Sequence, residues 1–275
     1  MNMTTPPILS VLTTAYNREK FIADSIRSVL ASTFTDFELI VVDDCSTDST
    51  VEIARSFTEK DGRVKVYVNE KNLGDYPNRN KAASYAIGKY IKYLDSDDMI
   101  YPHGLGFMVQ SMERFPEAGF GLASRADESR CYPVCISPVE IFLENFNGYG
   151  HFYRAPGSSI IKREVFEKEG GYSGERMIVD LDLWLRLSKK YPMVKFPFDL
   201  YWNRIHDGQE FNTDYARRIY PVRTQSLIDQ SLADPACPLS NDQKAEIVKL
   251  IKSNRKKEKL RKALRQIIYS YKLHK

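Results

Sequence analysis

The most distinctive feature of the chain is a set of three aspartates within four residues, Asp95, Asp97 and Asp98, directly after the apolar run 90–94. Such a run, rich in aromatic and β-branched residues, predicts a buried strand. Burying three unpaired carboxylates would be costly, so we expect them outside the core. A hard divalent cation that is shared with substrate phosphates would reconcile their charges. The pattern predicts a Mn²⁺ or Mg²⁺ site for a nucleotide diphosphate, and an acidic turn that caps the next helix is the alternative.

Further polar residues close two earlier apolar runs. Asp43 and Asp44 end one run, and Thr14 and Tyr16 end another. A carboxylate there could accept a hydrogen bond from a base N–H or a ribose hydroxyl, and an exposed tyrosine ring could stack on a nucleobase. Helix capping and turn formation by the aspartates, and packing of the tyrosine over a loop, are the alternatives. In an α/β sheet these strand ends would converge on one crevice.

Four residues elsewhere have side chains suited to transfer chemistry. The guanidinium of Arg79 could hold phosphate oxygens in a forked geometry. Asp180 or Asp182, at the start of a predicted helix, could take a proton from an acceptor hydroxyl as a general base. His206 could be a third protein ligand to a Mn²⁺-type ion or could contact phosphate. Alternatively, Arg79 is a solvated surface charge, the two aspartates lie in the first turn of a helix because the helix dipole favours acidic residues there, and His206 is a loop histidine without a role.

The elements that must position these residues alternate between strand and helix in the first half of the chain. Strands are predicted over 8–14, 37–42, 64–68, 90–94 and 119–123. Helices are predicted over 17–30, from a cap at 47 or 48 through 57, over 80–87, and from near 102 to 114. This order predicts an α/β fold with a mostly parallel central sheet, flanking helices and right-handed crossovers.

The second half of the chain has a less regular pattern. Ser137 and Glu140 form a capping-box pattern, with proline at the first helical position. The other predicted elements are a strand at 157–162, helices at 163–168 and 180–190, and extended segments at 193–198 and 201–205.

Composition and charge divide the chain of 275 residues into a body and a tail. With 43% hydrophobic and 28% charged residues, its usage is that of a globular protein. No apolar run approaches the ~18 residues that cross a bilayer, and no secretory signal is visible. From Leu239 onward there are 12 Lys and Arg against 3 Asp and Glu. We expect one domain over 1–235 and a basic helical tail over 236–275.

Two interpretations of the tail stay open. Apolar residues recur beside Lys and Arg at helical spacing, at positions 247, 250, 251, 260, 264, 267 and 268. The tail could be a helix packed on the domain, or it could attach peripherally to anionic lipids where a lipid-linked acceptor would reside. Nucleic acid is a disfavoured partner, because the body is acidic and no RNA-binding motif is present.

Taken in order, these segments resemble a known family, the family 2 glycosyltransferases, which have the nucleotide-diphospho-sugar transferase (GT-A) fold. The resemblance runs from residue 8 to about 210 and is carried by five motifs. They are SVLTTAYN at 10–17, FELIVVDDCSTD at 37–48, NLG at 72–74 with Arg79 and Asn80, YLDSDD at 93–98, and DLDLWLRL at 180–187. It implies a nucleotide-binding half at about 1–124 and an acceptor-binding half at about 125–235.

The resemblance also implies roles for single residues. It implies that Thr14, Tyr16 and Asp44 hold the nucleobase and that Arg79 contacts the nucleotide. It also implies that Asp97 contacts the ribose or the metal, that Asp98 is a direct metal ligand, and that Asp180 is the catalytic base. His206 matches a histidine that family members often have after the last core strands. The family usually has Glu where Val179 stands, so a second carboxylate near the acceptor is missing.

The resulting expectation is a cytoplasmic enzyme, either free or peripheral on the inner face of the membrane, that makes bacterial surface polysaccharide or glycolipid. It would transfer a sugar with inversion from a UDP- or GDP-type donor to a saccharide or lipid-linked acceptor, with Mn²⁺ or Mg²⁺. A degenerate subunit that binds nucleotide or a partner without turnover is the alternative. A sugar-nucleotide pyrophosphorylase and a dehydrogenase rank lower, because no glycine-rich loop follows the first predicted strand.

Overall fold

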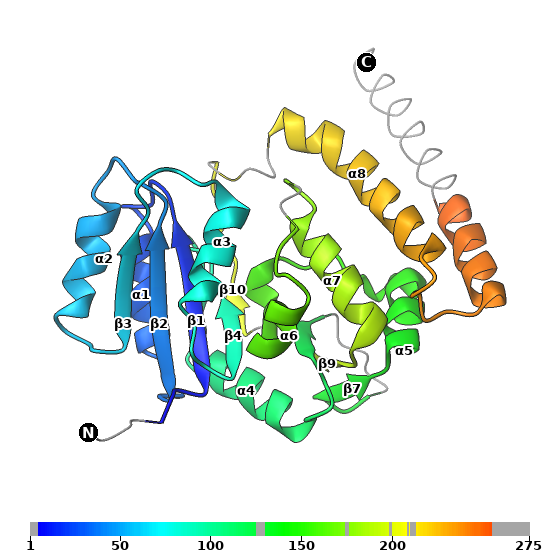
Figure 1. Cartoon of the computed structure of the whole chain (residues 1–275), viewed down its shortest axis with the longest axis horizontal. Helices are drawn as coiled ribbons and strands as arrows, with labels where there is room; N and C mark the ends of the chain where they lie inside the picture. Colours follow the sequence, from blue (N-terminus) through cyan, green and yellow to red (C-terminus); the bar gives the residue numbers. More distant parts are fainter. Residues whose placement is uncertain are drawn as a thin grey trace, which may run out of the picture.

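A central sheet of eight strands forms the middle layer of the protein in the computed structural model (Figure 1). The structure describes residues 5–124, 130–173, 176–197, 200–207, 209 and 213–254. The strand order is β3-β2-β1-β4-β8-β6-β9-β7. The strands are β1 (Leu9–Ala15), β2 (Phe37–Asp43), β3 (Val64–Val68), β4 (Tyr90–Tyr93), β6 (Phe120–Ala123), β7 (Val134–Ile136), β8 (Ser159–Lys162) and β9 (Met193–Phe196).

Most of these strands run in one direction. β1 lies parallel to β2 and β4, with Leu9 opposite both Phe37 and Tyr90, and β2 lies parallel to β3. β8 is antiparallel to both β4 and β6, so β6 and its parallel neighbour β9 run the same way as β1. β7 is antiparallel at the edge. The expectation of a mostly parallel sheet is confirmed, and the carboxyl ends of six strands share one edge.

Helices cover both faces of the sheet. The side chains of α1 (Ile22–Leu30), α2 (Thr50–Thr58) and α4 (Gly104–Arg114) enter the core on one face. Those of α3 (Asp75–Ser84), α5 (Pro138–Glu144), α6 (Arg163–Lys168) and α7 (Val179–Lys190) enter the core on the other. A π-helical turn (Asn145–Tyr149) and a 3-10 turn (Pro156–Ser158) follow α5, and α8 (Asp214–Ala233) lies outside α7.

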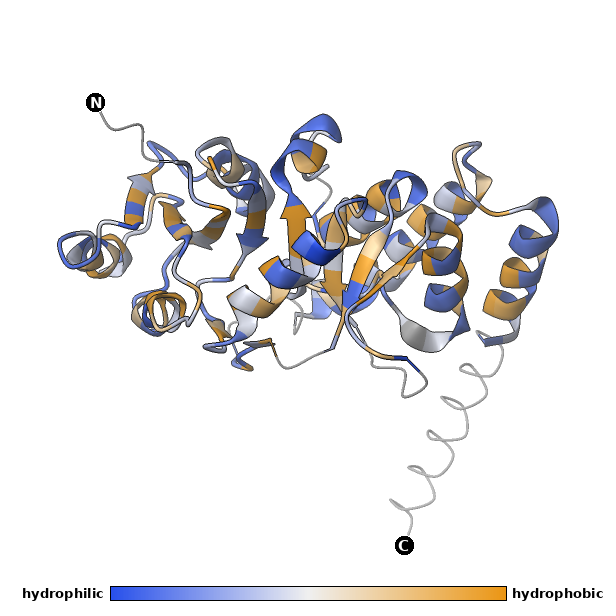
Figure 2. Ribbon diagram, turned by 90° about the horizontal axis from the view of Figure 1, so that it is seen from below, coloured by the Kyte–Doolittle hydropathy of each residue, from blue (hydrophilic) through white to orange (hydrophobic). Residues whose placement is uncertain are grey.

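The two-sided cover explains the apolar strands. Leu9 and Val11 point into one core and Leu12 into the other, and all three are fully buried. A strand buried on both faces reads as a continuous apolar run rather than an alternating one. Figure 2 shows apolar residues gathered in the strands and on the inward helix faces.

Several local predictions are confirmed and others are wrong at their boundaries. α5 starts with the predicted capping box, in which Ser137 N–H donates to Glu140 Oε2 at 2.8 Å. α3 begins at Asp75 instead of residue 80, because Pro77 sits in its first turn, where a missing N–H costs nothing. α8 was not expected, since Pro221 interrupts its sequence pattern. A small sheet of β5 (Met99–Ile100) and β10 (Tyr201–Trp202) was also not expected.

The first part of the tail packs on the domain. Leu239 and Ile247 are buried in the same core as α7, and Ile251 packs against it. Residues 241–254 are helical up to the last described residue, and the predicted apolar positions from 260 onward lie outside the described residues. Within the described ranges, no helix is both long and apolar enough to cross a bilayer.

Candidate functional site

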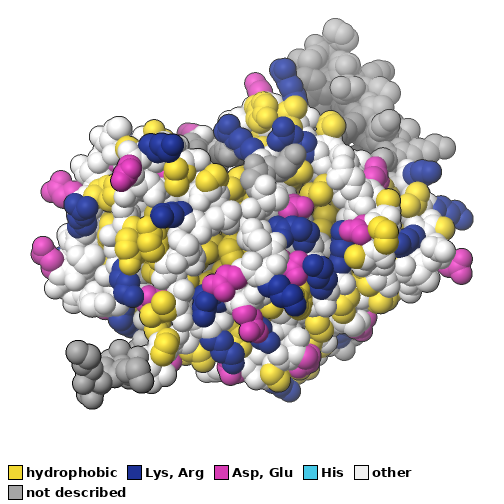
Figure 3. Space-filling view, in the orientation of Figure 1, with side chains coloured by type: hydrophobic (Ala, Val, Ile, Leu, Met, Phe, Trp, Pro, Cys, Tyr) yellow, Lys and Arg dark blue, Asp and Glu magenta, His cyan; other side chains and the backbone are white. Residues whose placement is uncertain are grey.

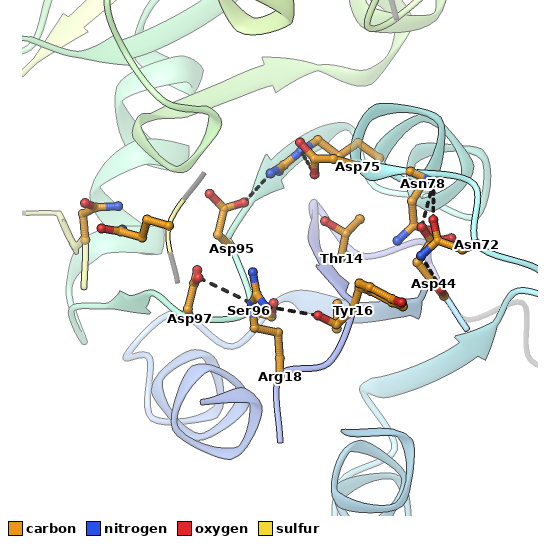
Figure 4. A pocket seen from close by; sticks show the side chains of 15 residues that line it. Thr14, Tyr16, Arg18, Asp44, Asn72, Asp75, Asn78, Asp95, Ser96 and Asp97 are labelled. Carbon is orange, nitrogen blue, oxygen red and sulfur yellow. Dashed lines mark hydrogen bonds and ion pairs between the residues drawn. The ribbon is translucent and has the colours of Figure 1, made fainter. Parts of the chain in front are cut away.

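A pocket of about 420 Å³ opens at the carboxyl edge of the sheet (Figure 4). It is bounded by the ends of β1, β2 and β4, the start of α3, and the segment after β10. Its lining residues are Thr14, Ala15, Tyr16, Arg18, Asp44, Asn72, Gly74, Asp75, Asn78, Arg79, Asp95, Ser96, Asp97, Asn203 and Gln209. The structure therefore brings together Thr14, Tyr16, Asp44, Arg79 and Asp97, all of which were predicted site residues.

One end of the pocket is organised by Asp44. Its carboxylate accepts hydrogen bonds from the backbone N–H groups of Leu73 and Gly74, both at 2.8 Å, and from Asn69 Nδ2 at 2.9 Å. Gly74 has a φ of 86°, a conformation that favours glycine, so the loop can present its N–H to Asp44. A carboxylate has about four acceptor sites, so one remains for a ligand donor. Asp44 both anchors the loop before α3 and faces the pocket.

Asp43 has a different environment from its neighbour. It is fully buried, and it accepts hydrogen bonds from the backbone N–H and the hydroxyl of Ser46, at 2.8 and 2.5 Å. It shapes the turn after β2 and does not line the pocket, which is the turn-forming alternative considered from the sequence.

Thr14 lies in the middle of the pocket, and the Tyr16 side chain extends from there toward the end with Asp44 (Figure 4). Thr14 is buried at the end of β1, whereas the Tyr16 side chain is 46% exposed. Arg18 donates to the Tyr16 carbonyl oxygen at 3.1 Å and lies 3.5 Å from Asp97 Oδ2. An exposed ring beside a carboxylate and a guanidinium suits a flat, polar ligand.

Arg79 is held between two carboxylates. Its Nε lies 3.0 Å from Asp75 Oδ1 and its Nη2 lies 2.7 Å from Asp95 Oδ1. Burial alone would lower the pKa of this guanidinium, but the charges of Asp75 and Asp95 raise it well above its ordinary value. Arg79 is therefore a permanent cation in the pocket wall, oriented from both sides.

The three aspartates after β4 occupy different environments. Asp97 lines the pocket, and its Oδ2 lies 3.0 Å from His206 Nε2. Asp98 is 1% exposed, so the expectation that none of the three would be in the core is wrong. Its carboxylate accepts from the Arg204 backbone N–H at 3.0 Å and from Asn203 Nδ2 at 3.1 Å, and these bonds satisfy the buried oxygens.

Burial changes the pKa values of two charged groups at this turn, Asp98 and Lys92. Burial and the charge of Asp95 raise the pKa of Asp98 to about 7. Lys92 is buried in β4 behind these aspartates and donates to the carbonyl oxygens of Tyr93 and Gly157. Burial lowers the pKa of Lys92 to about 7, although Asp95 and Asp98 oppose that shift. A buried lysine thus faces the inner side of the acidic turn.

The residues around Asp97 fit a divalent cation that completes its coordination with a ligand. Asp97 and His206 offer an oxygen and a nitrogen next to each other. Over the ranges that the structure describes, no group of three or more His, Cys, Asp or Glu side chains is arranged to hold an ion. Mg²⁺ is commonly held by one or two carboxylates together with substrate phosphates, so a two-residue set suits an ion that arrives with a diphosphate.

Asp180 lies at the start of α7, outside the pocket lining but close to Arg79. Burial raises the pKa of its carboxyl group to about 6, opposed by a 2.8 Å hydrogen bond from the Leu181 N–H and by the charge of Arg79. Burial and the nearby charge of Asp180 raise the pKa of Tyr220, in α8, to about 12. Asp182 instead pairs with Arg186 at 2.7 Å on another side of the helix. Of the two candidates for a base, Asp180 is the one whose carboxyl group is affected by the charges of Arg79 and Asp75, which line the pocket.

Sequence reasoning missed several lining residues. Asn203 and Gln209 belong to an irregular segment more than 100 residues after β4, and no periodicity marks them. Asp75 and Asn78 were read as loop residues before a helix that in fact includes them. Gly74, two residues after Asn72, was the available signal for this turn.

The pocket lies at the carboxyl edge of the sheet, with acidic residues just after β4 and a basic residue on α3. The sequence model of Glycosyl transferase family 2 matches residues 10–170, more than half of the chain. The chain belongs to glycosyltransferase family 2. The matched range contains Thr14, Asp44, Arg79 and the aspartates after β4, whereas Asp180 and His206 lie beyond it.

Several family members resemble the chain over different lengths. TuaG of Bacillus subtilis, named for teichuronic acid biosynthesis, is 37% identical over 123 residues, which are 43% of this chain and 49% of TuaG. The chain thus spans only about half the length of that relative, and 17% of a Rickettsia conorii glycosyltransferase. The glycosyltransferase GlyG of Streptococcus pneumoniae is 27% identical over 248 residues, 82% of this chain and 81% of GlyG.

Solved structures of proteins in complex with nucleotide-sugars share the fold. TarS 1–349 of S. aureus, crystallised with UDP-GlcNAc, has a TM-score of 0.68 and 20% identity, covering 87% of this chain and 70% of the crystallised 1–349 chain. The mannosyltransferase PcManGT of Pyrobaculum calidifontis, in complex with GDP-Man and Mn²⁺, has a TM-score of 0.65 and 18% identity, covering 86% and 67%. The expected GT-A fold of this glycosyltransferase family 2 member is confirmed.

Proposed function

We propose that the chain transfers a sugar, with inversion, from a UDP- or GDP-type donor to a hydroxyl of a saccharide or lipid-linked acceptor in bacterial surface polysaccharide or glycolipid synthesis. The observation that carries this proposal is the pocket itself. Its described lining has four aspartates and two arginines, an excess of negative charge at a place where the family fold holds an anionic nucleotide. A divalent cation would let such a pocket accept a diphosphate.

The arrangement of the pocket supports a direction for the donor. We assign the nucleobase to the end with Asp44 and Tyr16, where one carboxylate acceptor site and an exposed ring remain available. The diphosphate belongs at the other end, beside Arg18 and Asp97 (Figure 4). Neighbours of the same fold were crystallised with UDP-GlcNAc and with GDP-Man and Mn²⁺, which supports a nucleotide-sugar but leaves the base open.

We assign the metal to Asp97 and His206, with Asp98 supporting them from the core. Asp98 was expected to be the more direct ligand, but its oxygens are already engaged by Asn203 and Arg204. When bound, the cation would supply electrostatic stabilisation for the diphosphate that leaves. We also assign Arg79 a contact with the same phosphates, because its two carboxylate partners keep this buried cation oriented in the pocket wall.

The proposed chemistry uses Asp180 as the base. Its carboxylate takes the proton of the acceptor hydroxyl as the hydroxyl oxygen forms a bond to the anomeric carbon. The bond from that carbon to the diphosphate oxygen breaks on the opposite side, and the nucleoside diphosphate leaves with the electron pair. A carboxyl pKa of about 6 suits a base that must be ionised near neutral pH and still bind a proton.

A donor screen tests this proposal. The full chain should bind UDP or GDP in the presence of Mn²⁺, seen by calorimetry, and should release nucleoside diphosphate from one of the corresponding sugar donors. Asp97→Ala should abolish both. Binding without any release, with a range of saccharide acceptors, would instead support the degenerate subunit. No binding of either nucleotide would refute the proposal.

We also propose that the basic end of the tail contacts anionic membrane, where a lipid-linked acceptor would be found. The helix before it is fixed to the domain through Leu239 and Ile247, so it could serve as a rigid support. The face shown in Figure 3 has Lys, Arg, Asp and Glu intermingled. That face lacks a broad field of one sign, which leaves the tail as the stronger candidate for lipid contact.

A further inference from the structure

A single guanidinium joins several parts of the chain beside the pocket. Arg204 Nε donates a 2.9 Å hydrogen bond to the carbonyl oxygen of Asp97. Its backbone N–H donates to the Asp98 carboxylate at 3.0 Å, and its Nη2 lies 3.3 Å from Asp24 Oδ2 on α1. The Arg204 side chain is only 21% exposed. Arg204 therefore fastens the turn that carries Asp97 both to helix α1 and to the segment after β10.

The guanidinium also packs on two aromatic rings. It lies 5.1 Å from the ring centroid of Phe21 and 4.9 Å from that of Trp202, within the range of cation–π contacts. Phe21 in turn packs against the imidazole of His206, with ring centroids 4.8 Å apart. Phe21 thus contacts both Arg204 and His206, and this contact restricts the orientation of the imidazole.

Arg204 itself is not among the residues that line the pocket, whereas Asn203 and Gln209 are. Its carbonyl oxygen accepts a 2.7 Å hydrogen bond from Gln209 Nε2, so the same residue also orients part of the lining. Its contacts are with residues that line or support the pocket, and so any effect on a ligand must pass through them.

We infer that Arg204 is a positioning residue of the donor site. It holds Asp97 and His206 side by side in the protein before nucleotide and cation bind, so that less ordering is needed when they do. This inference rests on the proposed function, because it concerns how well the Asp97 and His206 pair is prepared for an ion and a diphosphate. It predicts an effect on affinity for metal and donor, and little effect on the turnover of the saturated enzyme.

The geometry requires arginine at this position. A planar guanidinium can donate hydrogen bonds at its edge to Asp97 and Asp24 while its faces pack on aromatic rings. A lysine ammonium could supply the charge, but it has no planar group that donates hydrogen bonds at its edge while its faces pack on rings. Arg204→Lys should therefore retain only part of the Mn²⁺ affinity that Arg204→Ala loses.

The test is Mn²⁺ binding to the full chain in the presence of UDP, measured by electron paramagnetic resonance of the free ion and by calorimetry. If UDP is not the preferred nucleotide, GDP replaces it. Arg204→Ala should weaken Mn²⁺ binding by about 10- to 100-fold, the usual effect of removing a partner that orients metal ligands. The KM for donor should rise, and kcat at saturation should change much less. Arg204→Lys should fall between Arg204→Ala and the unaltered chain.

Arg27→Ala is the matched control. Arg27 pairs with the other oxygen of Asp24 at 3.3 Å, but its side chain is 66% exposed and it touches neither Asp97 nor Phe21 in the described contacts. The Mn²⁺ affinity of the Arg27→Ala variant should equal that of the unaltered chain. An equal loss in Arg27→Ala and Arg204→Ala would overturn the inference, since it would trace the effect to α1 alone.

A double-mutant comparison separates positioning from general damage. If Arg204 acts through the Asp97 and His206 pair, Arg204→Ala should reduce Mn²⁺ affinity much less in a His206→Ala background than in the unaltered chain. An equal cost in both backgrounds, or unchanged Mn²⁺ affinity in Arg204→Ala, would overturn the inference. If Arg204→Ala does not fold, Arg204→Lys supplies the same comparison. Failure of the unaltered chain to bind Mn²⁺ with either nucleotide would refute the proposed function instead.

Discussion

Nη2 of Arg79, on α3, lies 2.7 Å from Oδ1 of Asp95, which follows β4, so the start of α3 is tied to the acidic turn. The same guanidinium also contacts Asp75, and its charge acts on Asp180 at the start of α7. The guanidinium of Arg79 thus links the pocket to the carboxylate proposed as the base. A change at Arg79 would reach both donor binding and proton transfer.

Replacing Asp180 should separate binding from chemistry. Asp180→Asn should lower kcat by about 10²- to 10⁴-fold, because the amide cannot accept the acceptor proton, while nucleotide affinity stays the same. Because burial raises the carboxyl pKa to about 6, the base is protonated at lower pH. In the unaltered enzyme kcat/KM should therefore climb as the pH rises through about 6. Full turnover by Asp180→Asn would exclude this residue as the base.

Asp182→Asn is the matched control for that experiment. Asp182 lies on the same helix, but its carboxylate pairs with Arg186, and the residue lines a separate cavity between α7 and α8. Turnover and its pH profile should be preserved in this variant. A loss equal to that of Asp180→Asn would mean that the whole start of α7, rather than one carboxylate, is being probed.

Removing Asp44 should affect both nucleotide binding and the loop before α3. Asp44→Ala deprives the N–H groups of Leu73 and Gly74 of their acceptor, which should cost about 1 to 3 kcal/mol of unfolding free energy. Nucleotide affinity, measured by calorimetry, should fall as well. Asp43→Asn alters a turn that does not line the pocket, so it should reduce stability with little change in affinity. Unchanged nucleotide affinity in Asp44→Ala would argue against contact with the base.

Strong local patterns in the sequence predicted most of the fold. Apolar runs such as 37–42 mark strands buried on both faces, and the order of elements then limits the topology. The pattern failed at α8, where Pro221 falls inside a helix that owes its place to packing on α7. Strand ends brought Thr14, Asp44 and Asp97 to one edge, as expected. The contacts of Arg204 could not be inferred, because they depend on how an irregular segment returns to the sheet.

The resemblance to the family implies a glutamate at the position of Val179, whose side chain is fully buried in the core. Val179→Glu should not add a useful carboxylate to the site. It should lower the unfolding free energy by about 3 kcal/mol or more, measured in urea, because a charged group would be placed in an apolar core. Val222→Glu, at a position that is 68% exposed, is the control and should be nearly neutral. A stable and more active Val179→Glu enzyme would contradict this account.

A buried charge cluster in the second half should make stability sensitive to acid. Glu144 lies 3.1 Å from Lys195 Nζ and 3.2 Å from His151 Nε2. Burial raises the pKa of Glu144, but these partners outweigh it and lower the pKa to about 2. Because the folded pKa is below the ordinary 4.5, the contribution is present above about pH 4.5 and is lost as the pH falls toward 2.

Glu144→Gln tests the cluster by urea unfolding at several pH values. At neutral pH it should lose about 3 to 5 kcal/mol, because the anion beside a buried lysine is removed. The difference from the unaltered chain should shrink as the pH falls below 4.5. Glu167→Gln removes a pair with Arg163 in which the glutamate side chain is 54% exposed, and it should cost less than about 1 kcal/mol. A pH-independent loss in Glu144→Gln would contradict the assigned charges.

Lipid contact by the tail predicts that the full chain and a chain without the basic end of the tail differ in their binding to vesicles. Ending the chain after Asn254 removes nine Lys and Arg but keeps Ile247 and Ile251, which pack on the domain. The shortened chain should lose binding to anionic phosphatidylglycerol vesicles while it keeps its fold and nucleotide affinity. Binding of the full chain should weaken at high salt and be absent with neutral phosphatidylcholine. Equal, salt-insensitive partitioning of both chains would remove the lipid role.

The reversed strand β8 has a consequence for redesign. Because it lies between β4 and β6 and runs against both, β6 and β9 regain the direction of β1, and their chains leave the sheet on the side where the pocket opens. The segment that follows Ala123 could therefore be exchanged between relatives while β1 to β4 are left untouched. The segment after Phe196 would have to be kept, because it leads to Asn203 and Gln209 of the pocket, so a library aimed at the acceptor needs to vary only the stretch after Ala123.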